Sequence, residues 1–138
     1  MKGTLRKGRE AQSLARGVLV NLGYPHVEEA RPQRMRLPNG AWRTLNEDIH
    51  GVFDLEGLGP AGVRLVQVTD GASVKERCDK ITANGPWPVD QGFCLVEVWD
   101  LQRRRNVVNP RLTDRFFRVT RLLPDGSWRA IEALEVEG

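Results

Sequence analysis

The sequence has no long hydrophobic run and little cysteine. No apolar stretch approaches the roughly 18 residues that a membrane-spanning helix needs. The basic N-terminal region leads into an amphipathic pattern rather than a signal-peptide core. The two cysteines, Cys78 and Cys94, lack the partners and the spacing of a zinc site, so we expect buried, reduced thiols. These absences predict a cytoplasmic protein without membrane contact and without a disulfide framework.

Internal repeats, low-complexity tracts and linker-like stretches are also missing from the 138 residues. A chain of this length can bury its own hydrophobic core without disulfides or metals to hold it together. We therefore expect residues 1–138 to form a single domain.

The hydrophobic pattern alternates between helical and extended periods. Expected elements are a helix over 6–22, an extended segment over 24–36, strands over 49–58 and 63–69, a helix over 73–81, a strand over 93–99, and strands over 116–123 and 128–134. Ser73 and Glu76 form a capping box at the second helix, and Asp125-Gly126 marks a hairpin turn. The order predicts an α/β fold with a mixed central β-sheet flanked by helices and a C-terminal β-hairpin.

Charge is unevenly distributed, although the net charge is only +3. Basic residues concentrate in the N-terminal third and between 103 and 121, whereas the acidic residues of 47–70 lie between them. Arginines that neutralise phosphates around carboxylates that hold a cation are typical of nucleases. The alternative is an ordinary solvated surface, with arginine favoured over lysine by a GC-rich or thermophilic genome.

The most informative stretch contains Asp54, which lies 13 residues before Gln67. On two strands joined by a short turn, both side chains can project from the same end of the sheet. There they can share one Mg²⁺ or Ca²⁺ ion, because these cations prefer oxygen ligands. Such a cation serves phosphodiester hydrolysis by activating a bound water. Taken separately, Asp54 can simply end a strand and Gln67 can be a hydrogen-bonded core amide.

These residues resemble the PD-(D/E)XK nuclease superfamily, most closely its small Holliday-junction-resolvase-like members, over about residues 6–100. The corresponding positions are Glu10 on the first helix, Asp54 at the motif aspartate, Gln67 at the Asp/Glu position and Thr69 at the lysine position. Asp48 and Gly51 extend the likeness to the Asp-x-x-Gly-x-x-Asp form of small phage and plasmid relatives, in which Gln-Val-Thr replaces Glu-x-Lys.

The resemblance implies a restriction-endonuclease-like core and a catalytic centre that uses Mg²⁺ or Mn²⁺. Its ligands would be Asp54, Gln67 and the backbone carbonyl of Val68, with Glu10 and Asp48 completing or supporting the shell. Thr69 cannot supply the ammonium group of the motif lysine. Lys80 or Lys75 on the second helix could supply it instead, because only the position of the charge matters.

The implied substrate is branched or otherwise structured DNA, cut by a homodimer because two symmetric cuts need two sites. Residues expected to contact DNA are Arg6, Lys7, Arg103, Arg104 and Arg105 at phosphates and Trp42 by stacking on a base. One alternative is a disabled nuclease scaffold that binds DNA or a protein, suggested by Gln67 and Thr69. Another is a regulator that binds a protein such as a polymerase through its basic surface.

Overall fold

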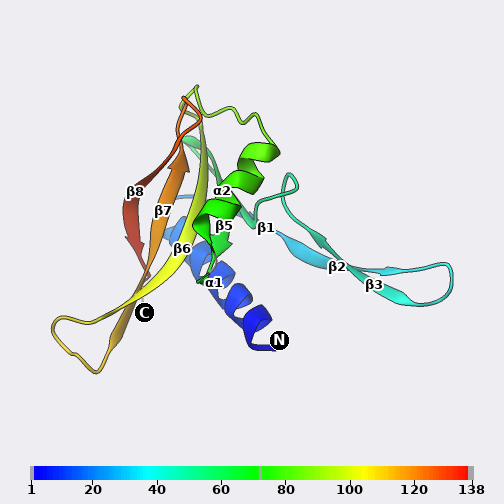
Figure 1. Ribbon diagram of the computed structural model, residues 1–138, viewed down its shortest axis with the longest axis horizontal. Coiled ribbons are helices and arrows are strands. Elements are labelled where there is room, and N and C mark those ends of the chain that lie inside the picture. Colours follow the sequence, from blue (N-terminus) through cyan, green and yellow to red (C-terminus); the bar gives the residue numbers. More distant parts are fainter. Residues whose placement is uncertain (1, 72, 137–138) are drawn as a thin grey trace.

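The computed structural model describes residues 2–71 and 73–136, without the side chains of 2–8, 32–34 and 43–47. Its elements are α1 (Lys2–Asn21), β1 (His26–Glu29), β2 (Arg31–Arg36), β3 (Trp42–Glu47), β4 (Leu55–Gly59), β5 (Gly62–Thr69), α2 (Val74–Ala83), β6 (Cys94–Arg105), β7 (Thr113–Leu122) and β8 (Trp128–Glu135). Together they form the expected α/β fold with a mixed sheet between two helices (Figure 1).

The main sheet has six strands in the order β1-β4-β5-β6-β7-β8. Neighbouring strands are antiparallel except for β5 and β6, which are parallel and are connected through α2. A parallel pair needs such a crossover, whereas tight turns suffice for β4–β5 and β7–β8. Gly62 has a φ of 129°, and a Cβ there would lie 2.0 Å from the carbonyl oxygen of Phe93. Glycine therefore lets β5 begin close to the loop that leads into β6.

The first helix covers one face of this sheet. Ala11, Ala15 and Leu19 recur at helical spacing and pack, fully or almost fully buried, in a core that includes Val66 and Trp99. Gly23, with a φ of 100°, follows the helix and ends it close to the predicted end at residue 22. Although α1 is 20 residues long, neither described helix has an apolar stretch suited to crossing a membrane.

The second helix covers the opposite face. Cys78 and Ile81 of α2 pack in a core with Val96, Val98 and other residues of the central strands. The Ser73 side chain caps the helix by accepting a hydrogen bond from the Glu76 backbone, so the predicted start is confirmed. The two cysteines are buried free thiols, and burial raises the pKa of Cys78 to about 11. Both cysteines therefore belong to the core.

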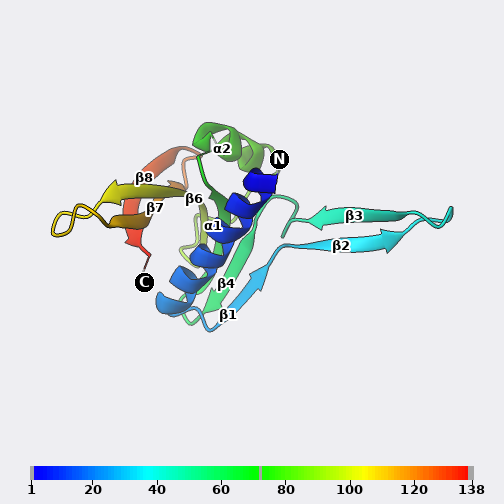
Figure 2. The same cartoon turned by 90° about the horizontal axis from the view of Figure 1, so that it is seen from below.

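Two hairpins extend beyond the body of the molecule in opposite directions (Figures 1 and 2). One is the separate two-stranded sheet β2–β3, and the other is the distal part of β6–β7. The expectation of one extended segment over 24–36 was wrong. Ala30 divides it into two strands: β1 pairs with β4 in the main sheet, and β2 pairs with β3 in the separate hairpin. The strand expected to end at Trp99 continues to Arg105, since its polar end is held by pairing with β7.

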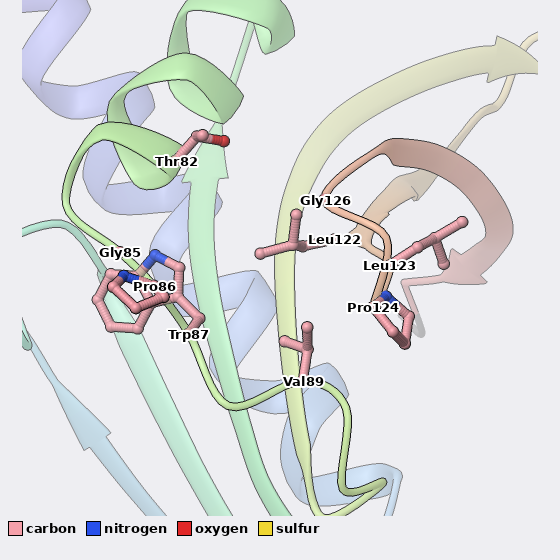
Figure 3. Close-up of a pocket in the computed structure, with 9 residues that line it drawn as sticks. All are labelled: Thr82, Gly85, Pro86, Trp87, Val89, Leu122, Leu123, Pro124 and Gly126. Carbon is pink, nitrogen blue, oxygen red and sulfur yellow. The ribbon is translucent and has the colours of Figure 1, made fainter.

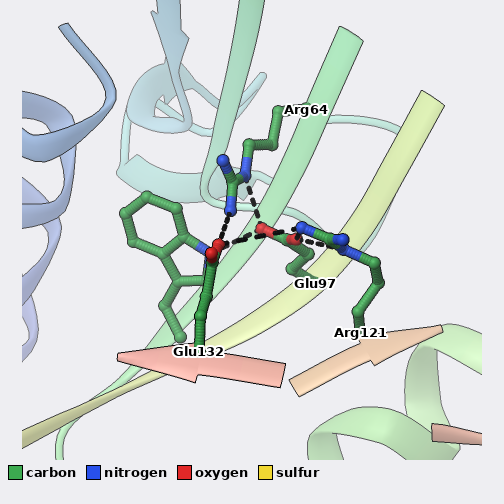
Figure 4. Close-up of polar contacts among 5 residues, drawn as sticks. Arg64, Glu97, Arg121 and Glu132 are labelled. Carbon is green, nitrogen blue, oxygen red and sulfur yellow. Dashed lines mark hydrogen bonds and ion pairs between the residues drawn. The ribbon is translucent and has the colours of Figure 1, made fainter. Parts of the chain in front are cut away.

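A buried ion-pair network joins the last four strands of the sheet (Figure 4). Glu97 is fully buried and accepts hydrogen bonds from Arg64 and Arg121, each at 2.6 Å, and from the Trp99 indole at 2.8 Å. Arg64 also donates to Glu132 at 2.8 Å. A buried carboxylate is tolerated because these donors replace its lost hydration. Arg64 and Arg121 are therefore structural residues.

Candidate metal and DNA-cleavage site

Asp54 lies immediately before β4, at the end of the sheet where β5 finishes. Its backbone N–H donates to Val66 at 2.9 Å, and its carbonyl accepts from Ala30 at 2.8 Å. One carboxylate oxygen, Oδ2, accepts from the Gln67 side-chain amide at 3.0 Å and from the Val68 backbone N–H at 2.7 Å. The structure thus brings Asp54 and Gln67 into direct contact across the β4–β5 turn.

The segment between Asp48 and Asp54 folds into a tight turn. Ile49 and Phe53 exchange two backbone hydrogen bonds, and Gly51 has a φ of 82°. Phe53 is fully buried and contacts the Trp87 ring edge-on at a centroid distance of 5.0 Å. The turn explains the Asp-x-x-Gly-x-x-Asp spacing. Because Ile49 and Phe53 are bonded to each other, the chain at Asp54 lies close to the chain at Asp48.

Electrostatics at Asp54 show which charges surround it. Burial is the main cause that raises the pKa of Asp54 to about 6, and the negative charge of Asp48 raises it further. The hydrogen bond from Val68 and the positive charges of Arg77 and Lys80 act in the opposite direction. Asp54 is therefore a carboxyl group with a pKa raised to about 6, and one acidic and two basic side chains act on it.

Lys80 is the α2 lysine that faces this site. Its Nζ atom lies 3.8 Å from Oδ2 of Asp48, and its charge acts on Asp54. Lys75 is exposed in the first turn of the same helix and is not among the charges that shift the Asp54 pKa. Of the two candidates to replace the motif lysine, the geometry favours Lys80.

Unsatisfied oxygen atoms lie on the same sheet face as the Gln67 side chain, near the end of β5. Among the described residues, Gln67 Oε1, Thr69 Oγ1 and Asp100 Oδ1 are buried without a hydrogen-bond partner. Gln67 and Thr69 alternate along β5 and so share a face, and Asp100 pairs with Thr69 in the parallel register. Buried acceptors without partners are uncommon and suit a ligand that supplies positive charge or protons.

Asp100 is a buried carboxylate next to Thr69 that the sequence did not single out. Burial raises its pKa, and Gln102 and the Gly71 backbone donate hydrogen bonds that oppose this effect. In the sequence, Asp100 is recognisable only as an acidic residue inside an otherwise buried strand. Its position next to Thr69 could not be predicted without the parallel β5–β6 register.

The structure does not bring Glu10 to this site, contrary to the expectation for the first helix. The Glu10 carboxylate is half-exposed and lies 3.4 Å from Arg115 of β7. Helix α1 packs on the face opposite to α2, so Glu10 faces the β6–β7 side of the molecule rather than Asp54. We therefore remove Glu10 from the candidate ligands.

The three arginines at the end of β6 do not form one surface, because successive strand residues point to opposite faces. Arg103 makes two 2.9 Å hydrogen bonds with Asp70, and Arg104 pairs with Glu135 while lying over the Phe116 ring. Arg105 is exposed. Of these three arginines, Arg105 alone has no described carboxylate partner.

The remaining predicted DNA contacts are at the edges of the molecule. Trp42 begins β3 on the projecting hairpin and is 58% exposed, with the Arg36 guanidinium 5.8 Å from its ring centre. It is the first residue of a hairpin strand. Arg6 and Lys7 belong to α1, but their side chains are outside the described part of the structure.

A separate hollow of about 200 Å³ lies between the segment after α2 and the β7–β8 turn (Figure 3). Its walls include Pro86, Trp87, Leu122 and Pro124. None of the residues predicted for metal binding lines it, and the lining is mostly apolar. The candidate chemistry therefore lies outside this hollow, at the end of β5.

The described residues contain no cluster of three or more histidine, cysteine, aspartate or glutamate side chains that could hold a metal ion. The site instead combines Asp54 and Asp48 with neutral oxygens, and Mg²⁺ commonly keeps several waters beside one or two carboxylates. Comparison with protein-family models, with curated proteins and with solved structures finds no match to this chain.

Proposed function

We propose that this protein is a divalent-metal-dependent DNA endonuclease of the PD-(D/E)XK type that acts on branched or otherwise structured DNA. The observation that carries the proposal is the contact between Asp54 and the Gln67-Val68 segment, with Asp48 and Lys80 beside it. These are the residues whose spacing resembles the nuclease motif.

The order of the elements supports the same proposal. Helix α1 precedes the antiparallel strands β1, β4 and β5, and the crossover helix α2 leads to β6, parallel to β5. Asp54 stands immediately before β4 and Gln67 near the end of β5. A restriction-endonuclease-like core requires this succession of an aspartate-bearing strand, a turn, a second motif strand and a helix.

The chemistry of these residues supports a Mg²⁺ or Mn²⁺ ion, because Gln67 Oε1 is a buried oxygen without a described partner and the same side chain contacts the ionisable carboxyl group of Asp54. Asp54, Gln67 and the Val68 carbonyl would hold the cation, and Asp48 would support them. When bound, the cation supplies a more acidic water and stabilises charge on the phosphate. Lys80 places its ammonium group near this position, which Thr69 cannot do.

A second candidate function is a disabled nuclease scaffold that binds DNA or a protein partner such as a polymerase. The observation that favours it is that Asp54 Oδ2 already accepts two hydrogen bonds, one of them from the Gln67 amide nitrogen. With a neutral amide in place of an acidic ligand, the site holds one negative charge fewer. Metal-dependent cleavage separates the two functions.

The experiment is incubation of the purified protein with linear, single-stranded and four-way-junction DNA in Mg²⁺, Mn²⁺ or a chelator. The proposal expects cleavage of the junction with metal and none with chelator. Binding without cleavage supports the disabled scaffold. We also propose that the protein acts as a homodimer, because two symmetric cuts need two sites. Sedimentation of the protein with and without a four-way junction tests this.

A further inference from the structure

The connection between β6 and β7, residues 106–112, carries two outward-facing valines. Val107 and Val108 are 95% and 93% exposed, whereas the other exposed large hydrophobic residues of the described chain range from 41% to 58%. Single exposed apolar residues are ordinary. Two adjacent ones, almost fully exposed at the tip of a projecting hairpin, mark an interaction site.

Hydrogen bonds made by Asn106 organise the tip. Its backbone N–H donates to Leu112 at 2.9 Å, and its side-chain oxygen accepts from the backbone of Val108 at 2.9 Å and of Asn109 at 2.8 Å. Its amide nitrogen donates to Asp114. The valines are therefore held in an exposed position before a partner binds, which lowers the ordering cost of binding.

Positive charge surrounds this apolar tip. Arg105 precedes it and Arg111 follows it, and both are exposed. In the described part of the chain, neither arginine lies within ion-pair distance of a carboxylate. An apolar tip between two unneutralised arginines is complementary to a stack of bases flanked by phosphates.

The hairpin grows out of the end of the sheet that carries the candidate site. Strand β6 pairs with β5 as far as Thr69↔Asp100 and then continues five residues to Arg105, roughly 17 Å at about 3.3 Å per residue. On the other side, β2 begins directly after Ala30, which bonds to Asp54. Asp54 is therefore bonded at the base of the β2–β3 hairpin, and β6 continues into its own hairpin from the same end of the sheet. The two hairpins project in opposite directions (Figures 1 and 2).

We propose that Val107 and Val108 form a wedge that enters the base stack of duplex DNA, while Arg105 and Arg111 contact the flanking phosphates. This inference rests on the proposed function, and it explains how the protein would select structured DNA. Unstacking costs least where bases are already unpaired or poorly stacked, as at a junction or mismatch. The wedge therefore favours branched over regular DNA without reading sequence.

The test compares the wild type with the Val107→Ser/Val108→Ser variant. The matched control is Val20→Ser/Leu22→Ser, which removes two half-exposed aliphatic side chains at the far end of α1, close to Gly59 rather than Asp54. Each protein is titrated into a four-way junction carrying 2-aminopurine beside the branch point, whose fluorescence rises on unstacking. Thermal unfolding confirms that each variant is folded.

The wild type and the control should raise the fluorescence, whereas the wedge variant should not, and its junction affinity should fall about tenfold. Wild-type binding and cleavage with unchanged fluorescence, or equal affinity of the wedge variant, would overturn the wedge and leave the nuclease intact. If the valine changes abolish a dimer in sedimentation without altering DNA binding, the tip contacts a second copy and the wedge is wrong. No binding of any DNA by the wild type would overturn the proposed function itself.

Discussion

The side-chain amide of Gln67 donates a hydrogen bond to Oδ2 of Asp54 at 3.0 Å, joining residues 13 positions apart. The amide nitrogen faces the carboxylate, and the amide oxygen is buried without a described partner. Cation binding would require that oxygen to turn toward the ion, since only oxygen atoms serve as Mg²⁺ ligands. The contact between Gln67 and Asp54 therefore lies at the centre of the proposed site, and a bound cation would replace this hydrogen bond.

The ionisation of Asp54 predicts a pH-dependent stability. Burial raises its folded-state pKa to about 6 from 3.8, so the folded protein binds the proton more tightly than the unfolded chain does. Protonation therefore favours folding below about pH 4, and this contribution is lost as the pH rises through about 6. We expect Asp54→Asn to increase the free energy of unfolding by about 2–3 kcal/mol at about pH 7.5 and to change it little at about pH 4. Urea unfolding at both pH values measures the difference, and an equal effect at the two would contradict the assignment.

Lys80 should supply the charge that Thr69 cannot. We expect Lys80→Met to lower metal-dependent cleavage about 100-fold or more, because a positive charge near the phosphate stabilises the transition state. Lys75→Met is the matched control on the same helix and should cleave like the wild type. Thr69→Lys should leave cleavage unchanged or lower it, because Lys80 already supplies the positive charge. Wild-type cleavage by Lys80→Met, or a gain in activity from Thr69→Lys, would show that the role is vacant.

Arg105 should contribute more to DNA binding than its neighbours. Arg103 and Arg104 are paired with Asp70 and Glu135, whereas no described carboxylate neutralises Arg105. Arg105→Ala should reduce the salt dependence of log affinity by about one unit, with little effect of DNA sequence. Anisotropy titrations between about 50 and 200 mM salt measure this slope. A smaller change for Arg105→Ala than for Arg103→Ala would contradict the expectation.

Elements governed by local periodicity were predictable from the sequence. The apolar spacing in α1 and the Ser73 cap of α2 each predict the observed element because one face of the helix is buried. The contact between Asp54 and Gln67 followed from a short turn between two strands.

The rest depends on long-range pairing that leaves little pattern in the chain. The β2–β3 hairpin and the distal end of β6 project from the body of the molecule, so their polar sequences show no burial period. The position of Glu10 depends on which sheet face α1 covers. Asp100 gains its meaning only from the parallel register with Thr69.

The buried network predicts a stability effect that leaves the site unchanged. Glu97→Gln removes the fully buried carboxylate that pairs with both Arg64 and Arg121, which leaves Arg64 only the more exposed Glu132, and should lower the free energy of unfolding by about 3 kcal/mol or more. Glu132→Gln is the control, because this more exposed carboxylate, which also pairs with Arg64, should cost about 1 kcal/mol or less. Denaturant unfolding gives both values, and similar costs for the two variants would show that Glu97 is not the centre of the network.

Junction cleavage by Asp54→Asn tests the central proposal most directly. The measurement compares wild type and variant on four-way-junction DNA with Mg²⁺ or Mn²⁺, with a chelator control, and follows binding of the same DNA in parallel. The variant should remain folded and lose cleavage while binding the junction equally or more tightly, because it removes a ligand charge and also a charge that repels phosphate. Undiminished metal-dependent cleavage by Asp54→Asn would contradict the account, and failure of the wild type to cut any DNA form would leave the binding scaffold as the function.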